Sequence, residues 1–505
     1  MKSSRHLFAI ACFALLAAGC PRSPTDDGPP GSARLPLEGR TLRLAVVGDP
    51  ALAEAVMHLR GEWNAQTGAE LEVVELSEDQ LREADAPPAD ALIIPSYMLG
   101  ELAERDSIAP VPKAITDSNP WSGIFDLPKL REAAWGKRTM AVPFGSPVFC
   151  CYYRADLLEK HGRQPPQTWR EYLDLAKLLA AERPDDPQWC ASLEPLAPGW
   201  AGLTLLARAA PAAKHHGNYS TLFNIDTMEP LIAGPPFVEA LEELAAAAKL
   251  SRGDPPRLDP AGVRKAFWNG RCGLAVTWPT GAAEGKEARG KGRGERGEEK
   301  KLREEGRETE GTDDSATAES PGEPIRVGFA ELPGSPRVYN VSEKAWGKRA
   351  EDADHRVSLL AVAGRLGVVS NQTENQPAAF KLLLWLSDDR MSVQTSALSP
   401  AATMFRHAHR DAPGLWVEET VPHAAAVEYG AAAAAAFAHE QWLAALRIPG
   451  RAEYLAALDE AVAAALDGRS PPKDALEQAA QKWREITNRL DADKQKSAYR
   501  HCVGL

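Results

Sequence analysis

The stretch AVPFGSPVFCCYYRADLLEKHGRQPPQTWREYLDLA, residues 141–176, decides the fold of this chain. It begins as an apolar extended run that Gly145 and Pro147 interrupt, which predicts a strand passing from one lobe of the protein into another. A short helix follows, and two prolines keep it from running on. Thr168 and Glu171 then form a capping box that starts the helix TWREYLDLAKLLA. Taken alone, the stretch predicts a junction between lobes and contains no catalytic residue.

Strands and helices alternate on the N-terminal side of this junction. Segments 41–47 and 69–76 predict strands, segment 50–68 has apolar residues at helical spacing, and 91–95 predicts a short buried strand. Such alternation predicts a parallel sheet covered by helices, in which ligands bind beyond the carboxyl ends of the strands. Asp49, Ser96 and Tyr97 follow two of these strands.

The C-terminal side continues the mixed pattern. Segment 262–279 predicts a helix end, a turn and a strand that ends at Trp278, and 357–370 predicts a near-continuous strand. Helices are predicted for 376–396, for the Ala-rich region 421–446, for 451–468, and for a last segment that follows Ser470. Segment 284–324 almost lacks large apolar side chains, which predicts disorder. It is either a tolerated loop insertion or an interaction tail.

The composition is that of a globular protein without a nucleic-acid footprint. The 505 residues are 44% hydrophobic and 25% charged, with a formal net charge of -12. Nucleic-acid-binding proteins favour basic faces, so we expect no nucleic-acid partner.

The first twenty residues predict export. Residues 1–19 have a basic start and an apolar run too short to cross a bilayer, as in a secretory signal peptide. The ending Leu-Ala-Ala-Gly-Cys resembles the bacterial lipobox, which makes Cys20 the lipid anchor; the alternative is a plain cleaved signal with an incidental cysteine. Residues 20–40 then predict a flexible tether. Of seven cysteines, the five beyond Cys20 predict buried thiols with room for one disulfide.

VPFGSPVFCCYYRADLLEKHGRQPPQTWREYLDLAKLL resembles the signature of the family 1 extracellular solute-binding proteins, the sugar-binding proteins of ABC importers. Four further segments resemble that family in its order, namely TLRLAVVGDP, FWNGRCGLAVTWP, AAFKLLLWLSD and RSPPKDALEQAAQKWREI. The chain departs from the family pattern at Arg154, where the family has asparagine. It also departs at Pro147 and Met98, where maltose-type relatives carry charged sugar contacts. These departures concern the solute more than the fold.

The resemblance implies an α/β protein of the periplasmic binding protein-like (type II) fold, with two α/β lobes joined by hinge strands and a ligand cleft between them. Lobe 1 is expected to comprise residues 41–147 and 361–418. Lobe 2 is expected to comprise 148–360 and 419–490, and 491–505 to form a C-terminal tail. The hinge crossings are expected near 147–150, near 358–364 and after about residue 415.

The implied function is capture of a small solute, most simply a carbohydrate, and its delivery to an ABC transporter permease by hinge closure. The protein would be a monomer without catalytic activity, cofactor or metal, anchored to the membrane by its N-terminal lipid in the periplasm or at the cell surface. The alternative is a sensory or scaffolding lipoprotein that keeps the fold without transport.

A sugar site stacks aromatic rings on the sugar faces and offers polar partners to the hydroxyls. Several candidate residues here also have a structural interpretation. Asp49 can cap the next helix, and Ser96 and Tyr97 can form a plain turn. Trp200 and Trp278 can pack in the core. Arg365 and Arg406 can form surface salt bridges. The full candidate set is Asp49, Ser96, Tyr97, Phe144, Gly145, Ser146, Trp200, Trp278, Arg365 and Arg406.

Little in the sequence predicts catalysis or metal binding. The pairs His215–His216 and His407/His409 lack a nearby carboxylate at ligand spacing, and both pairs predict solvated loops. No nucleophile elbow, phosphate loop or zinc-protease motif occurs in the sequence.

Overall fold

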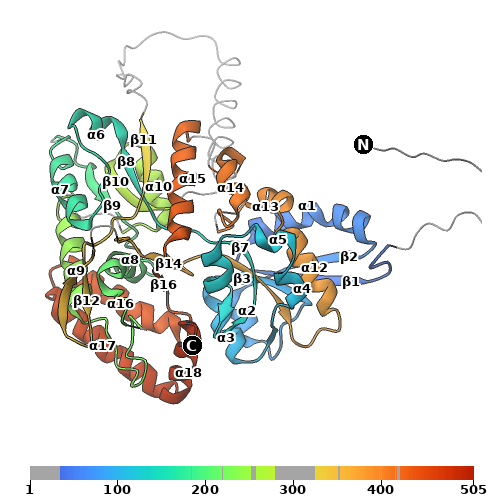
Figure 1. Ribbon diagram of the computed structural model, residues 1–505. Coiled ribbons are helices and arrows are strands. Elements are labelled where there is room, and N and C mark those ends of the chain that lie inside the picture. Colours follow the sequence, from blue (N-terminus) through green and yellow to red (C-terminus); the bar gives the residue numbers. More distant parts are fainter. Residues whose placement is uncertain are drawn as a thin grey trace, which may run out of the picture.

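The computed structural model describes residues 35–505 apart from 184, 219, 252–256, 279–324, 351–352, 397, 400, 416 and 418–420. The predictions for the leader 1–19, for Cys20 and for the insert 284–324 lie outside the described residues. Two α/β lobes lie side by side, and the C-terminal helix contacts both of them (Figure 1).

The first lobe is built on a mixed sheet of six strands. Its order is β2-β1-β3-β15-β4, and β7 also pairs with β15. The strands are β1 (Thr41–Val47), β2 (Glu70–Leu76), β3 (Ala91–Pro95), β4 (Ile108–Ala109), β7 (Val142–Gly145) and β15 (Arg365–Ser370). β1 is parallel to β2 and β3, as the sequence predicts, whereas β15 is antiparallel to β3, β4 and β7. The predicted parallel sheet is therefore parallel only in its N-terminal part.

Helices cover both faces of this sheet. Successive strand residues point to opposite faces and therefore join different core clusters. Leu44 and Ile93 join a core cluster with α1 (Pro50–Thr67) and α12 (Gln376–Leu386). Ala45 and Leu92 join a cluster on the other face, which includes α3 (Leu99–Glu104). The carboxyl ends of β1 and β3 therefore emerge between two helical layers.

The second lobe is built on the four-stranded sheet β11-β8-β10-β9. Its strands are β8 (Cys150–Arg154), β9 (Cys190–Leu193), β10 (Cys272–Thr277) and β11 (Val327–Glu331). Cys150 and Cys151 belong to different core clusters, because neighbouring residues of a strand point to opposite faces of the sheet. The five described cysteines are all buried free thiols. One face packs against α7 (Trp169–Leu179), α8 (Ala201–Ala213) and α9 (Pro235–Ala248), and the other against α10 (Pro260–Trp268) and α15 (His423–Ala438).

The chain crosses between the lobes at least twice. β7 belongs to the first sheet and β8 to the second, so residues 146–149 form one crossing. The run 357–370, predicted as one strand, is divided: β14 (Ser358–Leu360) pairs with β16 (Trp442–Ala444), and β15 joins the first sheet. Ala361 has a φ of 59° in the left-handed region, and this turn breaks the run.

The helical segments also differ in detail from the prediction. Segment 376–396 forms two helices, α12 and α13 (Asp389–Ser396), because Asp388 accepts the backbone N–H groups of Arg390 and Met391 and so caps a new helix. The Ala-rich region forms α15 and then β16. The C-terminal part forms α16 (Arg451–Leu466), α17 (Pro472–Arg489) and α18 (Ala492–Cys502), so the segment predicted only as a tail contains a packed helix.

The remaining elements are short. They are α2 (Glu78–Glu83), η1 (Ser96–Met98), α4 (Lys113–Thr116), α5 (Asn119–Ser122), η2 (Pro128–Glu132), β5 (Ala134–Trp135), β6 (Arg138–Thr139), α6 (Ala155–Lys160), β12 (Arg337–Asn340), β13 (Ala345–Lys348), α14 (His407–Asp411) and η3 (Pro413–Leu415). None of the helices within the described ranges combines the length and apolarity needed to span a membrane.

Candidate functional site

The register of the first sheet brings several predicted residues to one edge. Arg365 opens β15 and is the register partner of Pro95 in β3 and of Gly145 in β7. Tyr97 follows β3 by two residues, and Asp49 follows the neighbouring strand β1. The carboxyl ends of β1 and β3, where ligands bind in such sheets, therefore meet the start of β15.

Asp49 serves as both a helix cap and a polar group of this edge. Its Oδ1 accepts the backbone N–H of Leu52 at 3.0 Å and so caps α1. Its Oδ2 accepts Arg365 Nε at 3.1 Å and Ser399 Oγ at 2.6 Å. The capping alternative is thus correct, but the second oxygen of the carboxylate belongs to a buried polar cluster.

Tyr97 extends this edge toward the second lobe. Its hydroxyl donates to Glu78 of α2, and the guanidinium of Arg451 lies 4.0 Å from the centroid of its ring. Burial and the hydrogen bond to Glu78 raise the pKa of Tyr97 to about 12, although Arg451 and Arg365 oppose that rise electrostatically. Because Arg451 begins α16 of the second lobe, this pair joins the two lobes.

Two predicted tryptophans lie together on the second lobe. The rings of Trp200 and Trp278 are 5.1 Å apart, and Phe149 of the first crossing lies 5.4 Å from Trp278. Trp200 is partly exposed, whereas Trp278 is buried. Asp459 of α16 accepts the backbone N–H of Gly199, next to Trp200, at 2.5 Å. Aromatic and carboxylate groups therefore adjoin on this side.

We call Asp49, Glu78, Tyr97, Arg365, Trp200, Trp278, Arg451 and Asp459 the interlobe group. Its members are connected by the contacts above and by the electrostatic influence of Glu78 and Asp459 on Arg451. The group offers ring faces, carboxylates and guanidinium groups at the meeting of two lobes. These are the chemical types that hold a hydroxyl-rich solute.

Four other predicted residues gather around a buried carboxylate at the crossings. Ser146 donates to Glu132 of η2, and the burial of Glu132 raises its pKa, against the effect of Ser146 and Ser96. Phe144 is a core residue beside this cluster. A Cβ on Gly145 would lie 2.2 Å from the carbonyl oxygen of Ala401, so the close approach that requires glycine there is made by the chain itself.

Arg406 lies apart from the interlobe group. Its side chain is 1% exposed, and it donates to Asp389 Oδ1 at 2.5 Å and to the carbonyls of Ser387 and Pro120 at 2.7 and 2.6 Å. It therefore holds together segments within the first lobe. The predicted surface salt bridge is wrong in its location, because the guanidinium is fully buried.

The histidine predictions are corrected in one case. His409 is fully buried and shares a hydrogen bond of 2.9 Å with Ser392, so it does not lie in a solvated loop. Burial and the nearby Arg406 lower the pKa of His409 to about 3. Within the described ranges, His, Cys, Asp and Glu side chains form no group of three with metal-binding geometry.

Several members of the interlobe group were missed by sequence reasoning. Glu78 stands in the capping box of α2 and Arg451 follows Gly450, whose φ is 81°. From the sequence, Glu78 and Arg451 could be recognised only as residues at the start of a helix. Asp459 has the appearance of an ordinary helix residue in ALDEAVAAAL. Their convergence depends on packing between lobes, for which the local sequence has no signal.

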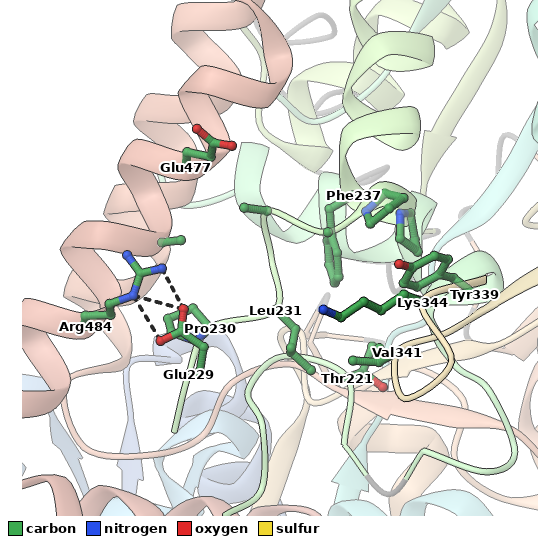
Figure 2. Close-up of a pocket in the computed structure, with 16 residues that line it drawn as sticks. Thr221, Glu229, Pro230, Leu231, Phe237, Tyr339, Val341, Lys344, Glu477 and Arg484 are labelled. Atoms are coloured by element: carbon green, nitrogen blue, oxygen red, sulfur yellow. Dashed lines mark hydrogen bonds and ion pairs between the residues drawn. The ribbon is translucent and has the colours of Figure 1, made fainter. Parts of the chain in front are cut away.

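A separate cavity of about 510 Å³ lies wholly within the second lobe (Figure 2). Tyr339 and Lys344 face it from the β12–β13 hairpin, and Arg484 of α17 is bonded to Glu229 at its other side. A ligand there would contact one lobe only, so it would not distinguish an open from a closed arrangement. None of the predicted site residues lines this cavity.

Comparison with known proteins gives a consistent assignment of the fold. The family described as "Bacterial extracellular solute-binding protein" matches residues 48–391. An ABC transporter solute-binding protein from Agrobacterium radiobacter K84, solved in complex with ribitol, is 17% identical, with a TM-score of 0.60 over 89% of this chain and 100% of that one. The sugar-binding protein MalE of Xanthomonas citri is 18% identical, with a TM-score of 0.62 over 89% and 98%. Maltose-bound MalE3 of T. maritima is 18% identical, with a TM-score of 0.58 over 89% and 100%. At these identities the solved structures establish the two-lobed fold.

Proposed function

The chain belongs to the bacterial extracellular solute-binding proteins, and from this membership we propose that it captures a small hydroxyl-rich solute between its lobes and delivers it to an ABC transporter permease. Proteins of this family bind solutes and are not enzymes. The solved relatives that carry ribitol and maltose support a sugar or polyol as the solute class.

The observation that carries the proposal is the contact between the two lobes at Tyr97 and Arg451. The guanidinium carbon of Arg451 lies 4.0 Å from the centroid of the Tyr97 ring. A solute that contacts both sides of this junction binds the closed arrangement more tightly than the open one, and so shifts the population toward closure. The permease would then recognise the rims of both lobes in their closed relation.

The aromatic pair supplies the second part of the argument. Trp200 is partly exposed and is supported from behind by the buried Trp278. A supported ring offers a flat apolar surface at little cost in side-chain entropy, which suits the weakly polar face of a sugar ring. Asp459, held by backbone amides beside it, offers carboxylate oxygens as hydroxyl acceptors.

Binding can be tested with a chain that begins at Ser32 and so retains every described residue. A thermal-shift screen against monosaccharides, oligosaccharides, polyols and amino acids should give hits among the sugars or polyols. A ligand at 100 times its dissociation constant stabilises the native state by about 2.7 kcal/mol. Hits among amino acids alone would contradict the solute class. Silence across the panel would favour a sensory or scaffolding role.

Variants locate the solute. Trp200→Ala should weaken the binding of a sugar hit about tenfold, and Trp278→Phe should weaken it less, because a ring remains behind Trp200. Trp346→Ala is the matched control, since Trp346 packs edge-to-face against Tyr339 in the β12–β13 hairpin, away from the interlobe group. Equal losses in Trp346→Ala and Trp200→Ala would contradict the proposed site.

We propose in addition that Cys20 carries the lipid anchor and that the monomeric protein works outside the cytoplasmic membrane. The support is the leader and lipobox-like sequence before Cys20. Cys20→Ala should release the protein from the membrane fraction and abolish labelling with a fatty acid. Retention and labelling of the variant would contradict the anchor. Light scattering of the chain from Ser32 checks the monomeric state.

A further inference from the structure

Arg451 occupies an unusual position for a cation. It is the first residue of α16, a 16-residue helix, where the partial positive charge of the helix N-terminus favours acidic side chains. Its guanidinium stacks over Tyr97 of the other lobe. The N–H donors of a guanidinium lie in its own plane, and this cation–π contact does not supply them with a hydrogen-bond acceptor.

The fully buried arginines of the described chain donate to protein acceptors, whereas Arg451 is half-buried. Arg208 donates to Glu194 at 2.7 and 2.6 Å, and Arg447 donates to the carbonyl of Glu132 at 2.6 Å. Arg451 differs, because its guanidinium makes no hydrogen bond and no ion pair among the described residues, and its Nε, like that of Arg447, is buried without a partner. Burial lowers the pKa of Arg451, although Tyr97 and nearby carboxylates oppose this. A cation left in this state is costly unless another group compensates it.

The two carboxylates that influence Arg451 electrostatically are already engaged by other groups. Glu78 accepts the hydroxyl of Tyr97 and also Arg82 Nη2, the latter at 2.7 Å. Asp459 accepts the backbone N–H groups of Gly199 and Gly202 at 2.5 and 2.7 Å. Both influence Arg451 electrostatically from beyond ion-pair distance. The interlobe group therefore contains one guanidinium whose hydrogen-bonding capacity is unused.

We infer that Arg451 binds a carboxylate of the solute, and that the solute is therefore an acidic sugar or a sugar acid instead of a neutral one. The inference rests on the proposed function and specifies its substrate class. A carboxylate has two oxygens in one plane and matches the paired donors of a guanidinium. A carboxylate also carries one negative charge, which the one uncompensated guanidinium of the interlobe group can balance. A phosphate dianion would bring two negative charges close to the carboxylates of Asp49, Glu78 and Asp459.

The test compares acids with their neutral counterparts on the mature exported protein in detergent. D-galacturonate is paired with D-galactose, D-gluconate with D-glucitol, and D-glucose 6-phosphate represents phosphate. Isothermal titration calorimetry should show that at least one of the two carboxylates binds tighter than its neutral partner by about tenfold or more. This preference should shrink as salt rises, since charge pairs are screened.

Arg451→Met should remove the preference, because methionine keeps an apolar stem beside Tyr97 and lacks the charge. Arg451→Lys keeps the positive charge but lacks the paired planar donors of a guanidinium, so this variant should retain part of the preference. It replaces the methionine variant in the test if that variant fails to fold. Arg489→Met is the matched control; Arg489 lies on α17, is exposed and bonds to exposed Glu453, so its loss should leave the preference unchanged.

Each other outcome overturns the inference. If galactose and glucitol both bind the wild-type protein as tightly as their acids, the solute is neutral and solute capture still stands. If only glucose 6-phosphate binds, the carboxylate assignment is wrong and capture again stands. If the thermal-shift screen finds amino acids as the only ligands, or if nothing binds to the wild-type protein, the inference falls together with the proposed solute class.

Discussion

Replacement of Arg208 by methionine should destabilise the second lobe strongly. Arg208 of α8 and Glu194 form two hydrogen bonds of 2.7 and 2.6 Å, and both side chains are almost completely buried. The variant leaves the Glu194 carboxylate buried without its cation, which costs about 3–5 kcal/mol. Since a native protein is stable by about 5–15 kcal/mol, this is a large part of the total. The consequence for function is that α8, which begins directly after Trp200, loses its anchor.

The geometry favours methionine as the probe. The Arg208 guanidinium lies 4.1 Å from the ring centroid of Trp169 and 5.2 Å from that of Tyr172, so the side chain also fills an aromatic pocket. Methionine fills much of that space without a charge, so the packing change is kept small. Urea unfolding followed by tryptophan fluorescence is the assay, because Trp169 lies against the substituted side chain.

Two further variants make the reasoning refutable. The exposed pair Arg484–Glu229 is the control, and Arg484→Met should cost only about 0–1 kcal/mol. The double variant Arg208→Met/Glu194→Leu removes both charges and should be more stable than Arg208→Met alone. If Arg208→Met costs no more than Arg484→Met, or if the double variant is no more stable than Arg208→Met alone, the buried pair is not coupled and the reasoning is wrong.

Three other predictions test the hinge and the local structure. Burial would lower the pKa of His439, but two carboxylate partners outweigh this and raise it to about 9. Stability from this imidazolium should therefore be complete below about pH 6.5 and be lost as the pH rises through about 9, and thermal unfolding of His439→Gln should lack that decline. Gly364→Ala should destabilise by about 1–3 kcal/mol, because its Cβ would lie 2.4 Å from the carbonyl oxygen of Gly145; Gly61→Ala in α1 meets nothing within 4 Å and should be neutral or stabilising in the same melting assay. Thr168→Ala removes the cap of α7 and should lower the midpoint of urea unfolding by an amount equivalent to about 1 kcal/mol; no change would contradict the capping role.

Local features of the chain were largely predictable. The start of α7 was readable because Thr168 Oγ1 accepts the N–H of Glu171 at 3.2 Å, a contact within four residues. Even there a detail differs, since the Glu171 carboxylate accepts the N–H of Gln167 instead of that of Thr168. β1 and β3 followed from short apolar runs that end at turn residues.

Contacts between distant segments were not predictable. Tyr97 and Arg451 lie more than three hundred residues apart in the sequence, and neither has a local pattern that indicates the other. Gly145 was correctly singled out as a place of close approach, but the approaching segment is Ala401–Ala402, which the sequence could not identify. The division of 357–370 depends on Ala361, a residue that rarely adopts the left-handed conformation and gives no warning of it.

The last helix has a mechanical consequence for any movement of the lobes. On one side of α18, Tyr499 bonds to Ser220 of the second lobe at 2.7 Å. On the other, the carbonyl of His501 accepts the N–H of Gly136 in the first lobe at 2.9 Å, and its ring lies 2.7 Å from Glu104. Two bodies joined only by crossing strands can both bend and twist, and each further attachment removes a direction of relative rotation. α18 therefore restricts the lobes to a narrower set of rotations, and a chain shortened before residue 492 should bend more freely about the same crossings.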